Sequence, residues 1–252
     1  AALKDIITRQ MDEYWGTSNP TVVSPQALEL ERSEHQRFGQ ERAPADSFVG
    51  RERHLQAIHS YLHNNSNQPL VIHGASGCGK TALLARAVDE LQNSRHTSQD
   101  HQPSTINHQL LYRFIGVTPR SSDVRSLLAS LCRELRQRHP LENPIPGDIR
   151  ELTKELDEHF KTATAQAPLI LFLDALDQLA DADNGPSLFW IPQLPGHVKL
   201  IVSCLSDRAP EDPASQPYTA LKRRGLQNFI NLDALSEDEA QTLLFERWLP
   251  QA

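Results

Sequence analysis

The chain has 252 residues, a formal net charge of -7 at pH 7 and a hydrophobic fraction of 38%. This length exceeds one average domain and falls short of two, so we expect one large globular domain with a small appendage. The longest aliphatic or aromatic run is Leu169 to Leu173, whereas a helix that crosses a bilayer needs about 20 such residues. Lys4 and Asp5 interrupt the apolar stretch that a secretory leader would need. We therefore expect neither a membrane protein nor an exported one, but a cytoplasmic protein.

The cysteines and the charge balance exclude two further classes of protein. Cys78, Cys132 and Cys204 are far apart and not in a metal-binding spacing, so we expect no disulfide framework. The acidic balance gives no support to a broad basic surface for duplex DNA or RNA, so nucleic acid is not an expected partner. Because the only methionine is Met11, we expect a piece of a longer polypeptide.

Two helices are predicted before the main domain. Apolar residues repeat with a period near 3.6 over residues 3–15, which indicates an amphipathic helix. Ser24 and Pro25 suit the start of a second helix, which we expect to run to about Arg37 and to be followed by a short linker. Residues 1–45 are thus expected to form the N-terminal helices and the linker.

Apolar runs alternate with helical periodicity over residues 46–233. Strands are expected at residues 70–72, 110–117, 169–173, 198–205 and 229–232. Strands that are apolar throughout indicate a parallel sheet with helices on both faces. The fold class is therefore α/β, a three-layer α/β/α domain with a mainly parallel five-stranded sheet. Ser236 to Glu239 would cap a further helix, so residues 234–252 are expected to begin a helical domain.

The connections between these strands carry weaker signals. We expect a polar, exposed loop at residues 93–107. Ser121 or Ser122 is expected to cap the next helix, and another helix is expected from Asp148 to Thr164.

The strongest motif lies directly after the first predicted strand. Its eight residues are Gly74, Ala75, Ser76, Gly77, Cys78, Gly79, Lys80 and Thr81. They match G-x-x-x-x-G-K-[ST] at every fixed position, although an ordinary glycine-rich turn is the alternative. Between a strand and a helix, such a loop turns backbone N–H groups toward phosphate oxygens. The motif predicts that Lys80 reaches the β- and γ-phosphates of a nucleotide and that Thr81 ligates Mg²⁺.

A carboxylate closes the third predicted strand. Ligands gather at the carboxyl ends of parallel strands, where we expect both Asp174 and the loop after Ile72 to lie, so Asp174 is expected to hold Mg²⁺ directly or through water. A capping role is the alternative. Asp177 is the candidate for a base that orients the attacking water, because the neighbouring Gln178 is neutral and cannot take a proton. Helix capping is the alternative for Asp177 as well.

Three segments together resemble the STAND class of P-loop signal-transduction ATPases, which are AAA+-like. They are residues 74–81, 169–179 and 198–204. The likeness is to the NACHT-like branch, related to the AP-ATPases, and Ala175 after the metal-binding aspartate is typical of that branch. The resemblance covers about residues 46–248, and it implies that Val49, Gly50 and Arg51 lie close to adenine.

The same resemblance implies a function. Members use ATP or ADP with Mg²⁺ as the state of a switch, the open form self-associates, and effector and sensor domains lie outside this chain. It also implies a sensor position after the fourth strand, for which Ser203, Ser206 and Arg208 are candidates, although Arg208 could be a solvated loop residue. Gln178 replaces the second acid of the usual Asp-Glu pair, so hydrolysis is expected to be slow.

Three other functions remain open from the residues alone. An active ATPase motor would need a competent base and an arginine supplied by a neighbouring copy. A small-molecule kinase would need a lid over its acceptor, and no arginine-rich lid segment is evident. An interaction scaffold would keep its nucleotide without turnover. The preference for ATP or GTP is also open.

Overall fold

Five parallel strands form one sheet in the computed structural model, which describes residues 25–44, 48, 50–96, 108–118, 120–237 and 239–241. The strand order is β2-β3-β4-β1-β5, and every neighbouring pair is parallel. The bounds are Leu70–Gly74 for β1, Gln109–Phe114 for β2, Leu169–Asp174 for β3, Val198–Leu205 for β4 and Phe229–Asn231 for β5. The predicted parallel five-stranded sheet is confirmed.

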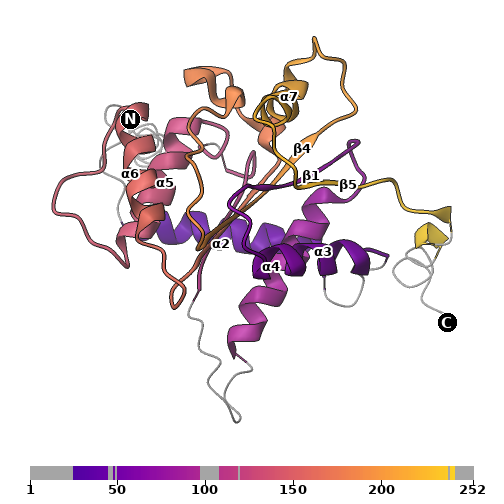
Figure 1. The fold of residues 1–252 in the computed structure, drawn as a ribbon, viewed down its shortest axis with the longest axis horizontal. Helices are drawn as coiled ribbons and strands as arrows, with labels where there is room; N and C mark the ends of the chain where they lie inside the picture. Colours follow the sequence, from indigo (N-terminus) through magenta and orange to yellow (C-terminus); the bar gives the residue numbers. More distant parts are fainter. Residues whose placement is uncertain are drawn as a thin grey trace, which may run out of the picture.

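Helices cover both faces of this sheet (Figure 1). Ile170 and Phe172 of β3 pack toward the helices α3 and α4, whereas Leu171 and Leu173 pack toward α5, α6 and α7. Successive side chains of a strand point to opposite faces, so the continuous apolar run of β3 fills both cores. The helices are α3 (Glu52–His63), α4 (Lys80–His96), α5 (Val124–Arg136), α6 (Ile149–Lys161) and α7 (Gln216–Arg223).

Short 3-10 helices make up part of the connections around β3 and β4. Their bounds are Leu176–Gln178 for η2, Ala182–Ser187 for η3 and Pro213–Ser215 for η4. None of the helices in the described part of the chain is long and apolar enough to cross a lipid bilayer.

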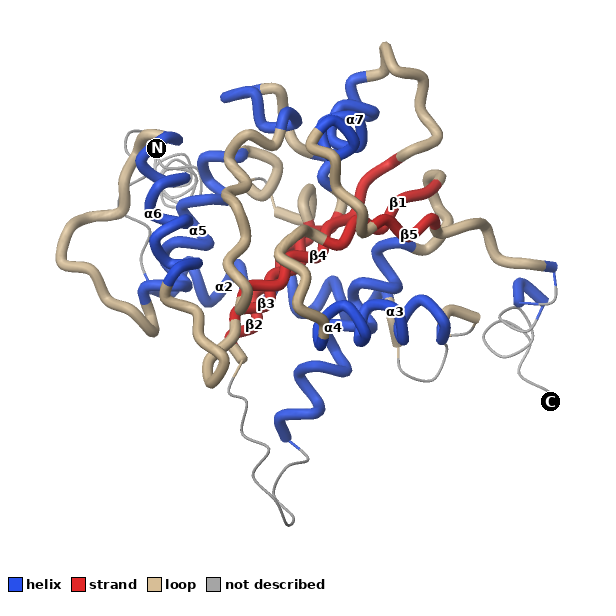
Figure 2. Tube along the Cα trace, in the orientation of Figure 1, coloured by secondary structure: helices blue, strands red, loops and turns tan. Residues whose placement is uncertain are grey.

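One further helix, α2 (Pro25–Arg42), lies beside the β2 edge of the sheet (Figure 2). It continues past the expected end at Arg37 and occupies part of the expected linker. It packs against α4, β2 and α5. Tertiary contacts therefore extend a helix whose own sequence indicates an earlier end. The helix predicted over residues 3–15 lies outside the described residues.

Two predictions about the connections are wrong. The loop predicted over residues 93–107 begins later, since α4 runs to His96; the Asn93 side chain donates to Asp89 at 3.1 Å and the Ser94 hydroxyl donates to the Leu91 carbonyl at 3.0 Å within it. Residues 97–107 lie outside the described residues. The cap of α5 is Asp123, whose carboxylate accepts from the Ser126 N–H at 2.8 Å. Ser121 instead organises the preceding turn, since its hydroxyl accepts from the Gly116 N–H at 3.0 Å.

Candidate functional site

The loop between β1 and α4 encloses open space. Gly77 and Gly79 adopt left-handed φ angles of 79° and 97°, which glycine tolerates without strain. A Cβ atom built on either residue would meet nothing within 4 Å. The first N–H groups of α4 have no acceptor within the helix and carry partial positive charge. This part of the chain therefore offers a cradle suited to a phosphate chain.

Gly74 is required for a different reason, which is close packing. A Cβ atom there would lie 2.4 Å from the Leu232 carbonyl oxygen and 2.9 Å from the Cys78 sulfur. Any larger residue would push the loop away from the segment that follows β5.

The Lys80 ammonium is folded against the loop that it follows. Its Nζ donates to the Gly74 carbonyl at 3.0 Å and to the Ala75 carbonyl at 2.7 Å, and it lies 3.8 Å from the Cys78 sulfur. These contacts keep a cation at the rim of the cradle. A bound polyphosphate would compete with the two neutral carbonyls for this group, and charged acceptors make the stronger hydrogen bonds.

Asp174 is buried at the end of β3, with 3% of its surface exposed. Its carboxylate accepts from the Ser203 hydroxyl at 2.5 Å, and the Thr81 side chain lies close enough to lower its pKa. Burial raises the pKa of Asp174 above its usual value, although the Ser203 hydroxyl and the nearby Thr81 side chain oppose the shift. The Thr81 and Asp174 side chains thus lie close together at the carboxyl end of the sheet, and their roles toward Mg²⁺ remain predictions. Two oxygen ligands suited to Mg²⁺ lie together beside the cradle.

Asp177 stands next to this pair and is already engaged at both oxygens. Its Oδ1 accepts from the Leu205 N–H at 3.2 Å, and its Oδ2 accepts from the Gln178 side-chain amide at 3.0 Å. The chain reaches it through Ala175, whose φ of 58° is left-handed and costs about 1–2 kcal/mol in a residue with a Cβ. A small residue at this position limits the steric conflict.

Arg51 joins the loop after β1 to the segment that follows β5. Its Nη2 donates to the Cys78 carbonyl at 3.0 Å and to the Asp233 carbonyl at 2.6 Å, and its side chain is buried. Gly50 precedes it with a left-handed φ of 79°, and a Cβ there would lie 2.8 Å from a Glu239 carboxylate oxygen. Val49 lies outside the described residues.

A cleft of about 410 Å³ adjoins the phosphate cradle. The residues of the loop from Ala75 to Gly79 form one side, and Arg51 and Phe48 form another. Arg42 at the end of α2 and the next two residues, Ala43 and Pro44, also line it, as do Ala82, Ala234 and Leu235. Pockets of roughly 300–1,000 Å³ hold small molecules, so the cleft is large enough for the base and sugar of a nucleotide.

The predicted sensor residues separate in the structure. Ser203 bonds directly to Asp174, as described above, whereas the Ser206 hydroxyl lies 3.0 Å from Nδ1 of His73. The Arg208 side chain is 43% exposed, and its Nε lies 3.9 Å from the carboxylate of its neighbour Asp207. Arg208 is not among the residues that line the cleft.

Two features of this region escaped prediction from the sequence. One is the contribution of Arg42 and Pro44 to the cleft, which depends on how α2 packs. The other is Arg113, a buried cation in β2 that contacts Glu31 and Glu134. The sequence does contain a signal for this cluster, because Arg113 is a charged residue within an otherwise apolar predicted strand.

Comparisons with known proteins agree with this geometry. The family described as AAA ATPase domain matches residues 47–202. NACHT and WD repeat domain-containing protein 2 of Mus musculus is 34% identical over 161 residues, which is 61% of this chain and 9% of that protein. NACHT domain- and WD repeat-containing protein 1 of Homo sapiens is 29% identical over 172 residues, which is 64% of this chain and 10% of that protein. This chain therefore spans about a tenth of the length of these relatives.

Among solved structures, the ORC1 protein of Aeropyrum pernix, determined in complex with DNA, has a similar fold. The TM-score is 0.50 at 14% sequence identity, and the match covers 82% of this chain and 52% of that chain.

Proposed function

Because the chain belongs to the family of AAA ATPase domains, we propose that it is an ATP- or ADP-binding switch module that depends on Mg²⁺ and hydrolyses ATP slowly. One observation carries the proposal. The open glycine cradle, the Lys80 ammonium and the Thr81–Asp174 pair all lie at the same edge of the sheet. This combination suits a nucleoside triphosphate and its metal ion.

Each residue has a role in this proposal. Lys80 would neutralise the β- and γ-phosphates, while Thr81 and Asp174 would hold Mg²⁺. The metal ion would supply positive charge at the phosphates when it is bound. The Ser203 hydroxyl would orient the Asp174 carboxylate, and Arg51 would line the cleft that takes the rest of the nucleotide.

Slow hydrolysis follows from the surroundings of Asp177. Its carboxylate accepts hydrogen bonds at both oxygens, and Gln178, which supplies one of them, cannot accept a proton. Gln178→Glu would place a second carboxylate beside Asp177, where the Gln178 amide now lies 3.0 Å from Oδ2. Two adjacent carboxylates raise the pKa of one of them toward the range of a general base.

We therefore expect Gln178→Glu to increase ATP turnover by about 100-fold, the lower end of the usual gain from general-base catalysis. Single-turnover and steady-state phosphate release would measure it. Gln56→Glu, an equivalent change on the exposed side of α3, should leave turnover unchanged. Turnover that is unaltered by Gln178→Glu would contradict the role given to this pair.

The second prediction here concerns Asp174. Asp174→Asn removes a buried charge but keeps a group of the same shape, so we expect the nucleotide-free protein to gain about 1 kcal/mol in unfolding free energy. The same change should weaken the Mg²⁺ dependence of ADP binding while sparing binding itself. Titration calorimetry with and without Mg²⁺ would test this, with the exposed Asp181→Asn as control. Equal Mg²⁺ dependence in variant and parent would exclude Asp174 as a ligand.

We also propose the setting of this module. Residues 46–233 would form the ATPase core, residues 1–45 the N-terminal helices and linker, and residues 234–252 the start of a helical domain. Effector and sensor domains would lie elsewhere in a longer STAND-type protein whose relatives combine NACHT and WD repeat domains. Its three buried free thiols suit the reducing cytoplasm.

Within that protein, nucleotide state would control self-association. A motor should show ATP turnover per chain that rises as the protein concentration increases, whereas a slow switch should not. The competing function is a scaffold with a permanently bound nucleotide. The Gln178 amide also fits that function, because a group that cannot accept a proton does not promote hydrolysis. Nucleotide that stays bound through purification without any turnover would favour the scaffold.

A further inference from the structure

The carboxyl end of α2 is a wall of the nucleotide cleft, although α2 lies outside the residues that match the family. Arg42, Ala43 and Pro44 all line the cleft. The Arg42 guanidinium lies 4.8 Å from the centre of the Phe38 ring, which holds this cation on the helix. A nucleotide in the cleft would therefore meet a positively charged side chain that belongs to α2.

The middle of α2 is joined to the strand beside Asp174. His35 is fully buried, and its Nδ1 accepts from the Phe114 N–H of β2 at 3.2 Å. Phe114 pairs in register with Asp174, and the next residue, Ile115, donates its N–H to the Asp174 carbonyl at 3.1 Å. The helix thus contacts both the cleft and the backbone that carries the proposed metal ligand.

A buried ion cluster fastens α2 near its amino end. The guanidinium of Arg113 in β2 lies 3.3 Å from the Glu31 carboxylate of α2 and 2.8 Å from the Glu134 carboxylate of α5. The Ser130 hydroxyl also donates to Glu31 at 2.9 Å. An ion pair to Arg113 and a hydrogen bond from Ser130 therefore hold this part of α2 against β2 and α5.

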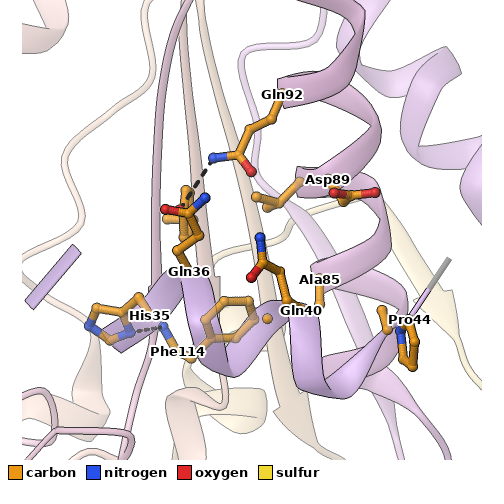
Figure 3. A pocket seen from close by; sticks show the side chains of 12 residues that line it. His35, Gln36, Gln40, Pro44, Ala85, Asp89, Gln92 and Phe114 are labelled. Atoms are coloured by element: carbon orange, nitrogen blue, oxygen red, sulfur yellow. Dashed lines mark hydrogen bonds between the residues drawn. The ribbon is translucent and has the colours of Figure 1, made fainter. Parts of the chain in front are cut away.

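Between these points, a pocket adjoins the contact between α2 and α4. It has a volume of about 210 Å³, and Figure 3 shows Gln36 and Gln40 on α2 and Gln92 on α4 around the same space. The apolar contact beside it is a small cluster around Ala43, Ala85 and Phe114. Protein interiors are normally close-packed, so a pocket beside this contact reduces the apolar area that holds α2 in place and lowers the cost of separating it.

We propose that α2 is a nucleotide-responsive wall of this site. Contacts from the nucleotide to Arg42 and Pro44 hold α2 docked on α4 and β2, and loss of the nucleotide loosens it. The inference rests on the proposed nucleotide binding. Coupling between two binding events is reciprocal, so docking of α2 must in turn tighten nucleotide binding. In this way α2 links the state of the cleft to the residues that precede the helix in the chain.

A disulfide between α2 and α4 would test the coupling in both directions. A Cβ built on Gly39 lies 3.8 Å from the Ala85 Cβ, which is the usual separation in a disulfide. The double variant Gly39→Cys/Ala85→Cys should therefore crosslink under a mild oxidant such as oxidised glutathione. The Phe114 ring, 3.2 Å from the added Cβ, has to shift slightly to admit it.

We expect saturating ADP with Mg²⁺ to speed crosslinking by at least about fivefold, the lower end of typical couplings. The oxidised protein should also release a fluorescent ADP analogue about fivefold more slowly than the same protein after reduction. The two single cysteine variants control for reactions of the native thiols. Equal crosslinking rates with and without bound ADP would overturn the inference. A parent protein that binds no ADP would overturn the proposed function instead.

A pair of surface variants tests the same inference without a crosslink. Arg42→Ala should raise the Kd for ADP about fivefold. Arg37→Ala removes the same charge from the same helix, at a side chain that is 76% exposed and lines neither cavity, and should leave the Kd unchanged. Equal Kd values for Arg42→Ala and the parent would contradict the role of α2 as a wall of the site.

Discussion

Lys80→Ala should abolish the rise in melting temperature that ADP or ATP with Mg²⁺ produces in the parent protein. A ligand at 100 times its Kd stabilises the folded state by about 2.7 kcal/mol, so the parent shift is easily measured. The Lys80 ammonium already lies at the rim of the cradle, 3.0 Å from the Gly74 carbonyl, and it is the cation that the motif provides for the phosphates. Differential scanning fluorimetry over a range of nucleotide concentrations would measure the loss.

A matched control separates this effect from a general loss of charge. Lys154 is 79% exposed on α6 and is paired only loosely with Glu158, at 3.9 Å. Lys154→Ala should keep the full nucleotide-induced shift. A shift of the same size in Lys80→Ala and in the parent would refute the assignment of the loop.

Arg113→Ala should lower the unfolding free energy by about 3–5 kcal/mol, a large share of the stability of a domain. Arg113 is only 2% exposed, and its removal would leave the carboxylates of Glu31 and Glu134 without their buried cation. Breaking a buried pair at one partner is costly because the other charge stays behind in a poorly solvated place. Urea unfolding followed by circular dichroism would give the difference.

The neighbouring Arg32 provides the comparison. It also approaches Glu134, at 3.4 Å, but its side chain is 41% exposed, so Arg32→Ala should cost no more than about 1 kcal/mol. In the double variant Arg113→Ala/Glu134→Ala, part of the loss should be recovered, since one uncompensated charge is removed as well. Similar losses for Arg113→Ala and Arg32→Ala would show that burial does not govern the cluster.

Features encoded by short, regular patterns were predictable from the sequence. The apolar residues of β3 predict a strand through the period of their side chains. The glycines after β1 predict a tight loop through the freedom of their backbone. The placing of Asp174 and the loop after β1 at the same edge followed from one general property of parallel sheets, that the carboxyl ends of their strands share an edge.

Features that depend on contacts between distant segments were not predictable. The extension of α2 past Arg37 relies on packing against α4 and β2, and the cleft wall at Arg42 relies on that extension. Asp123 rather than a serine caps α5 because the Ser121 hydroxyl is engaged by the turn after β2. No local pattern indicates which of several capping residues a neighbouring turn will occupy.

The two bonds of Arg51 bear on how the domain can be produced in isolation. One guanidinium nitrogen donates to both the Cys78 carbonyl and the Asp233 carbonyl. The hydrogen bonding of Arg51, which precedes the first strand, is therefore complete only when Asp233, which follows the last strand, is present. An expression fragment trimmed directly after β5 would delete that acceptor and leave a buried donor unsatisfied beside the loop. Recombinant boundaries for this domain should therefore be drawn beyond Asp233, even though the sheet is complete before it.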